Sequence, residues 1–158
     1  MKWDEIGSQT CSIARALGEM GDRWSLLILR ECFLRTRRFS DFAERTGASR
    51  NLVADRLEKL VAAGILERHR YQERPPRDEY RLTEKGLDLY PVMMALVRWG
   101  DRWHDDGRGK PIEHIHRGCG HIMHAEPSCS ECGERLDPRD VEVRLGPALR
   151  DASAPRIE

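Results

Sequence analysis

A glycine between two short amphipathic segments constrains the fold of this chain more than any other feature. Residues 39–46 form the first segment, where Ser40 is suited to cap a helix and Gly47 to end it. The second segment starts at Arg50 and stops at Ala63-Gly64. Its apolar residues follow one face of an α-helix: Val53, Leu57, Leu60 and Val61. Helix, tight turn and helix in this order predict a helix-turn-helix motif.

The segments on either side of this motif complete a winged domain. Asp22 can cap a helix that precedes it. Residues 65–71 and 79–83 have the alternation typical of strands, and the connection over residues 72–78 holds two prolines that prevent further ladder pairing. We therefore expect a mostly α fold with a small β-hairpin wing, which is a winged helix-turn-helix.

The last predicted helix, over residues 84–103 with Thr83 as its cap, is apolar on more than one side. Pro91 should kink this helix or divide it in two. A helix of an isolated domain this small needs only one buried face, so the second face needs a partner. We expect a homodimer through the N-terminal helix and helix 84–103. The alternative is that the extra face packs on the N-terminal helix of the same chain.

A recognition helix near residues 49–63 would enter the major groove of DNA, where its first residues reach the base edges. Arginine can pair with guanine, asparagine with adenine, and a methyl group can contact thymine. Arginines of the wing, near residues 72–78, would reach the flanking backbone or minor groove. The candidate DNA-binding residues are Arg38, Ser49, Arg50, Asn51, Ala54, Arg56, Arg74 and Arg77. For Arg56 the alternative is an ion pair with an acid such as Glu58 or Glu67.

The charge balance excludes a chain-wide attraction to polyanions, because Lys+Arg and Asp+Glu both number 27. No apolar run is long enough to cross a bilayer, and the polar N-terminus carries no secretory signal. We therefore expect a cytoplasmic protein with no membrane partner. Clustered cysteines in that reducing compartment are better explained as metal ligands than as disulfides.

A short module after a polar linker carries the strongest chemical pattern. His116-Arg117-Gly118-Cys119-Gly120 and Cys129-Ser130-Glu131-Cys132-Gly133 both read ligand, two residues, ligand, glycine. The two ligand pairs are separated by nine residues with a hairpin tip near residues 123–127, and they predict a zinc-ribbon-like module with a closed, structural Zn²⁺ site. The predicted ligands are His116, Cys119, Cys129 and Cys132. Residues 141–145 alternate like a further strand.

The energetics of this module also favour a metal, since a unit of under about 40 residues with few large aliphatic side chains rarely folds without one. Three other histidines compete for the fourth ligand position: His114, His121 and His124. The alternative to a metal site is a loose tail that carries reduced cysteines.

Residues 11–104 resemble the HxlR family of winged-helix transcription regulators, which is allied to the MarR-like regulators. The resemblance is carried by Gly21-Asp22-Arg23-Trp24, Arg38-Phe39-Ser40-Asp41-Phe42 and Pro75-Pro76-Arg77-Asp78-Glu79-Tyr80. It implies a homodimer, joined through its first and last helices, that binds half-sites of operator DNA about 34 Å apart. At Arg50-Asn51 many relatives carry Pro-Lys, so operator preference does not transfer.

The resemblance also implies a candidate redox sensor at Cys11, because some members of that family sense oxidants or electrophiles through an N-terminal cysteine at this position. Sensing needs a thiolate, which the start of a helix and the nearby Arg15 would favour. The alternative is a small side chain packed in a dimer interface.

These features predict a dimeric, sequence-specific DNA-binding transcriptional regulator, for which a small-molecule effector is possible. The alternative is an RNA-polymerase-associated adaptor or general transcription factor without sequence specificity. The sequence has no glycine-rich phosphate loop, paired acid and base or histidine-activated nucleophile, so we do not expect an enzyme. We expect the DNA-binding and dimerisation domain over residues 1–106, the zinc module over 107–148 and a flexible tail over 149–158.

Overall fold

The computed structural model describes residues 3–150 as a mostly helical chain with a two-stranded hairpin, as predicted. The chain divides into two compact units between Met93 and Met94, within a helix, and the predicted domain boundary after residue 106 stays a prediction. The elements are the 3₁₀ helix η1 (Trp3–Ser8), the helices α1 (Ser12–Met20), α2 (Arg23–Phe33), α3 (Phe39–Thr46), α4 (Arg50–Ala62), α5 (Glu84–Leu87), α6 (Tyr90–Trp103) and α7 (Pro147–Arg150), and the strands β1 (Leu66–Gln72), β2 (Arg77–Leu82), β3 (His114–Ile115) and β4 (Ile122–Met123).

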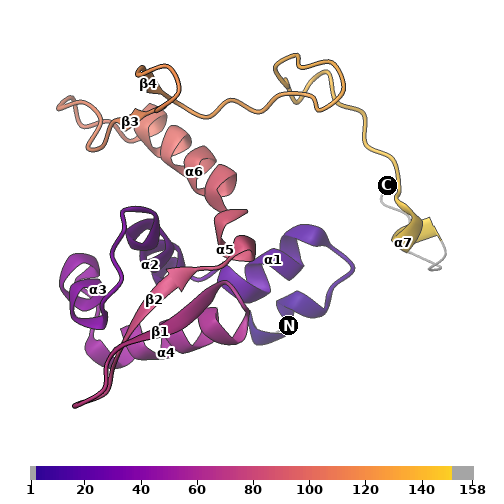
Figure 1. The fold of residues 1–158 in the computed structure, drawn as a ribbon. Helices are drawn as coiled ribbons and strands as arrows, with labels where there is room; N and C mark the ends of the chain where they lie inside the picture. Colours follow the sequence, from indigo (N-terminus) through magenta and orange to yellow (C-terminus); the bar gives the residue numbers. More distant parts are fainter. Residues whose placement is uncertain (1–2, 151–158) are drawn as a thin grey trace. The chain divides into compact units, whose positions relative to one another are not determined.

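The core of the first unit lies between α2, α3, α4 and the β1–β2 hairpin (Figure 1). The predicted inward face of α4 is confirmed at Val53, Leu57 and Leu60, which are fully buried, whereas Val61 is half-buried at its edge. This apolar contact fixes the rotation of α4 and leaves its opposite face in solvent. The other buried members of the core are Met20, Ile28, Leu29, Cys32, Phe42, Ile65, Leu66 and Met93.

Asp22 caps α2 as predicted, since its Oδ1 accepts hydrogen bonds from the backbone N–H groups of Trp24 at 3.0 Å and Ser25 at 3.1 Å. The prediction that Ser40 caps α3 is wrong. Arg38 occupies the N-cap position and the helix begins at Phe39, so Ser40 already lies in the first turn. The Ser40 hydroxyl donates to the Asp41 carboxylate instead.

The wing is longer than the sequence suggested. β1 and β2 pair in antiparallel register as far as Gln72 opposite Arg77, so only residues 73–76 form the connection and the predicted loop over 72–78 was too long. Both prolines lie in that turn, where they remove no ladder hydrogen bond. Arg38 forms an isolated bridge with Glu79 and adds a third chain segment to the edge of the wing.

The predicted helix over residues 84–103 is divided into α5 and α6, as the presence of Pro91 suggested. Thr83 caps α5 by accepting a hydrogen bond from Gly86 N–H at 3.1 Å. Pro91 stands in the first turn of α6, where its missing N–H breaks no helical hydrogen bond. None of the helices in the described part of the chain is both long and apolar enough to span a membrane.

The second unit consists of the end of α6 and short hairpins. Strands β3 and β4 pair around residues 116–121, and an isolated bridge joins Ser128 to Arg135. Within residues 94–150 the predicted strand over 141–145 is absent, and Val143 is 89% exposed, because no neighbouring segment pairs with it. Of the predicted tail, Leu149 and Arg150 belong to α7, and the rest lies outside the described residues.

The capping results yield a stability prediction. Replacing Asp22 by alanine should lower the free energy of unfolding by about 1–3 kcal/mol, because two backbone donors of α2 lose their acceptor and the half-buried Arg56 guanidinium loses an ion-pair partner. Ser40→Ala is the matched control and should change stability by less than about 0.5 kcal/mol. Urea denaturation followed by circular dichroism would compare the variants, and an equal loss in both would contradict this account of the caps.

Candidate nucleic-acid interface

The turn between α3 and α4 is held by local hydrogen bonds. Gly47 ends α3 in the left-handed conformation at φ +69°, which favours glycine, and its N–H donates to Ala43 O. Thr46 Oγ1 donates to Phe42 O at 2.6 Å and accepts from Ala48 N–H at 3.3 Å. These bonds set the direction in which α4 leaves the turn.

The first turn of α4 is exposed and fixed in place. Ser49 is its N-cap and accepts from Leu52 N–H at 3.3 Å. Arg50 and Asn51 are exposed, and Ala54, one turn later, is half-buried. The Arg50 guanidinium lies 5.3 Å from the centre of the Phe39 ring, so α4 and the start of α3 are linked by a cation–π contact.

A second cation–π contact links the same region to the wing. Arg38, which is exposed and directly precedes α3, lies over the ring of Tyr71 in β1 at 5.0 Å from its centre. At the tip of the wing, Gln72 Nε2 donates to the carbonyl oxygens of Arg74 and Pro75 at 3.2 Å and 3.1 Å. Arg74 and Arg77 are both exposed there. The structure thus joins the start of α4, the start of α3 and the wing into one basic surface.

Arg56 does not belong to this surface. Its Nε lies 3.1 Å from Asp22 Oδ1, its Nη1 lies 3.2 Å from Asp55 Oδ2, and only 21% of its side chain is exposed. The suspected partners Glu58 and Glu67 are not the ones it uses. Arg56 therefore connects α4 to the start of α2 rather than extending into solvent.

Sequence analysis missed two acids on the outer side of α4. Asp55 and Glu58 are both exposed; Asp55 pairs with Lys59 at 3.3 Å, and Glu58 pairs with Arg68 of β1 at 3.7 Å. The sequence could have predicted that these acids lie near Arg50 and Asn51. Asp55 follows Asn51 by four residues and Glu58 follows Asp55 by three, and residues three or four apart share one face of a helix.

Comparison with known families identifies the fold. Residues 19–108 match the HxlR-like helix-turn-helix family. The chain belongs to this family. It is 42% identical over 141 residues to the uncharacterized HTH-type transcriptional regulator Rv3095 of Mycobacterium tuberculosis, a match that covers 88% of each chain.

Solved structures extend the likeness. The crystal structure of PA1607, described as a transcription factor, covers 92% of this chain and all of its own, with a TM-score of 0.79 and 29% identity. The oxidized form of the redox regulator HypR matches 60% of this chain and 99% of its own, with a TM-score of 0.56 and 28% identity. These HxlR-like and related proteins are regulators rather than enzymes, in agreement with the sequence-based expectation.

The two cysteines of the first unit lie in different environments. Cys11 is exposed at the N-cap position of α1, and redox sensing there stays a prediction. Cys32 is buried in α2, and burial, followed by the negative charge of Glu31, raises its pKa to about 12. The Cys32 thiol therefore stays protonated at neutral pH and serves as a core side chain.

The predicted metal ligands form two pairs. His116 Nδ1 lies 3.4 Å from Cys119 Sγ, and Cys129 interacts with Cys132. Hydrogen bonds from the backbone amides of Cys132 and Glu131 lower the pKa of Cys129. Among the residues that the structure describes, no three His, Cys, Asp or Glu side chains are gathered around one point.

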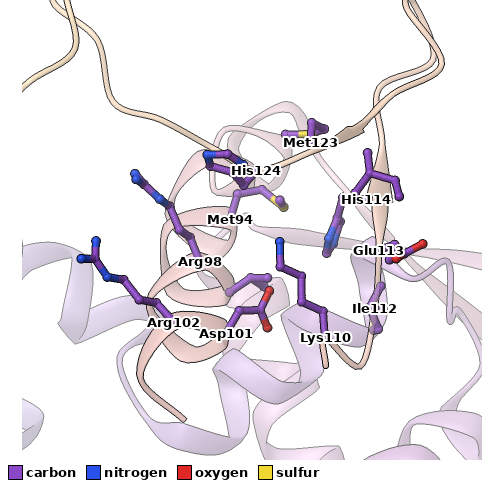
Figure 2. Close-up of a pocket in the computed structure, with 12 residues that line it drawn as sticks. Met94, Arg98, Asp101, Arg102, Lys110, Ile112, Glu113, His114, Met123 and His124 are labelled. Carbon is purple, nitrogen blue, oxygen red and sulfur yellow. The ribbon is translucent and has the colours of Figure 1, made fainter. Parts of the chain in front are cut away.

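A cavity of about 210 Å³ lies in the second unit, between α6 and the β3–β4 hairpin (Figure 2). Met94 and Met123 contribute apolar surface, Arg98, Arg102 and Lys110 contribute positive charge, and Asp101 and Glu113 contribute negative charge. Effector binding itself stays a prediction.

Proposed function

We propose that this protein is a dimeric, sequence-specific DNA-binding transcriptional regulator. In this proposal α4 enters the major groove, and the tip of the wing contacts the flanking backbone or minor groove. The observation that carries it is the exposed basic surface formed by the first turn of α4, Arg38 and the wing, which two cation–π contacts hold together. Family membership supports the general role in DNA binding and transcription regulation.

Base recognition is assigned to the first turn of α4. Arg50 can donate two hydrogen bonds to the O6 and N7 of guanine, and Asn51 can pair with the N6 and N7 of adenine. The methyl group of Ala54 can contact thymine. Stacking of Arg50 on Phe39 restricts its side chain before DNA binds, which lowers the entropy lost on contact.

Phosphate contacts are assigned to Arg38, Arg74 and Arg77, which are exposed. Because the chain as a whole is neutral, the attraction to DNA must arise from this local surface. Arg56 is left out of the phosphate contacts, since it is paired with Asp22.

Dimerisation is supported by the apolar side chains that α1 and α6 leave in solvent. Ile13 of α1 is 72% exposed, and Leu96, Trp99 and Trp103 of α6 are 47%, 59% and 63% exposed. Leu96, Trp99 and Trp103 are three and four residues apart and so share one face of α6, and an exposed apolar face of this kind is typical of an interaction surface. A symmetric pair of chains would present two α4 helices to half-sites about 34 Å apart.

Selection of binding sites from random duplexes by the full chain tests this function. We expect an enriched, inverted-repeat sequence. Tight binding to RNA polymerase without any preferred duplex would instead support an adaptor.

Arg50→Ala should weaken binding to the selected site by about 1–3 kcal/mol and relax the preference at one base pair of each half-site. Arg139→Ala, which removes an exposed arginine of the second unit, is the control and should bind normally. Fluorescence anisotropy on the selected site and on single-base variants would measure both. An equal loss on unrelated DNA would refute base reading by Arg50.

Substitutions at Arg77 and Arg56 should distinguish an effect on DNA binding from an effect on stability. Arg77→Ala should weaken binding to all sequences and reduce the salt slope of the binding constant by about one, with little change in unfolding. Arg56→Ala should lower the free energy of unfolding by about 1–2 kcal/mol and leave the salt slope unchanged. Salt titrations and urea denaturation of both variants give the comparison. A reduced slope for Arg56→Ala would show that this side chain leaves Asp22 to contact phosphate.

Leu96→Glu should shift the chain from dimer to monomer, because a carboxylate in the apolar face of α6 would be buried without a partner. The control is Val143→Glu, which places the same charge at an exposed apolar residue away from α6. Sedimentation velocity would read the masses, and a dimer that tolerates Leu96→Glu would contradict the role of this face.

A further inference from the structure

Each pair of predicted ligands sits in a tight turn at the end of a short hairpin. In the first turn, Gly120 N–H donates to His116 O at 2.7 Å, and Gly120 adopts φ +72°. The strands on either side, β3 and β4, close this hairpin. The backbone of this turn therefore directs the side chains of His116 and Cys119 toward the same side.

The second turn repeats this construction with a different sequence. Gly133 N–H donates to Cys129 O at 2.9 Å, Gly133 adopts φ +76°, and the Ser128–Arg135 bridge closes the hairpin. A left-handed glycine directly after the second ligand gives the tight turn that lets both ligands of a pair reach one ion.

The structure also distinguishes between the competing histidines. His116 Nδ1 lies 3.4 Å from Cys119 Sγ, close to the roughly 3.6 Å that separates nitrogen and sulfur ligands on a tetrahedral zinc ion. His124 is already paired with Glu126 at 3.1 Å, and His114 is half-buried beside the cavity of α6. His121 contributes its backbone oxygen to His116 N–H at 3.0 Å.

No apolar core holds the two hairpins in this unit. Within residues 94–150 the only buried apolar side chain is Met94, which belongs to α6, and Ile115, Ile122 and Leu136 are 60%, 56% and 42% exposed. A unit this small needs another source of stability to adopt one arrangement.

We propose that His116, Cys119, Cys129 and Cys132 bind one zinc ion, which draws the two hairpins together. Each cysteine that binds releases its proton to solvent, so the closed site holds three thiolates and one neutral imidazole. Four protein ligands leave no open position, so the ion is structural.

The test uses the full chain, purified, stripped of metal under reducing conditions and titrated with Zn²⁺ or Co²⁺. We expect one ion per chain, and for Co²⁺ the intense visible bands of a tetrahedral site with sulfur-to-metal charge transfer. Amide resonances of residues 112–136 should shift and disperse, whereas those of the winged domain should change little. Binding of fewer than one ion per two chains, or octahedral Co²⁺ bands, would overturn the proposal.

Ligand variants identify the residues. Cys119→Ser, Cys129→Ser, Cys132→Ser and His116→Ala should each weaken Zn²⁺ binding by more than about 100-fold, since losing a direct ligand costs more than losing a supporting contact. His121→Ala, His124→Ala and Cys11→Ser are the controls and should keep full affinity. Unchanged affinity in His116→Ala with a loss in His121→Ala or His124→Ala would overturn the assignment of His116. The thermal transition of the winged domain, followed separately, shows that each variant is folded there.

Discussion

The contacts of the Asp22 carboxylate help to set the orientation of α4, the helix proposed to recognise DNA. The carboxylate caps α2 through two backbone N–H groups, accepts a short hydrogen bond from the Ser25 hydroxyl, and holds the half-buried guanidinium of Arg56. One side chain thus joins the start of α2 to the middle of α4. Together with the apolar contacts of Val53 and Leu57, this fixes which face of α4 meets solvent, and therefore which residues can meet DNA.

Much of this domain follows from local sequence rules. The spacing of Val53, Leu57 and Leu60 predicts the buried face of α4, and Gly47 and Ser49 mark the turn before it, because periodicity and capping involve neighbouring residues only. The pairing of Arg56 with Asp22 joins residues far apart in the chain, which local rules cannot anticipate. The bridge between Arg38 and Glu79 was missed for the same reason.

The outer side of α4 combines basic and acidic groups, which has consequences for selectivity. Asp55 and Glu58 follow the basic first turn and are held by Lys59 and Arg68. In the proposed complex with DNA, these charges would oppose non-specific attraction to phosphates, so affinity would have to come from contacts that the first turn and the wing make together. A neutral chain with a locally basic edge should bind non-specific DNA more weakly than a uniformly basic chain would. The difference between its affinities for specific and non-specific DNA would then be larger.

In the second unit the sequence predicts the turns that carry the candidate metal ligands better than it predicts the strands around them. The spacing of the candidate ligands predicts two turns, and both are present. The expected strand over 141–145 does not form, because an alternating sequence does not by itself provide a second strand to pair with. Glu126, in the connection between the hairpins, accepts from Arg98 of α6 at 3.0 Å and from His124 at 3.1 Å, and also pairs with Arg135 of the second hairpin. This carboxylate links the connection between the two hairpins to α6. In the proposed zinc-bound form, these contacts would lower the conformational entropy that is lost when the two turns meet at the ion.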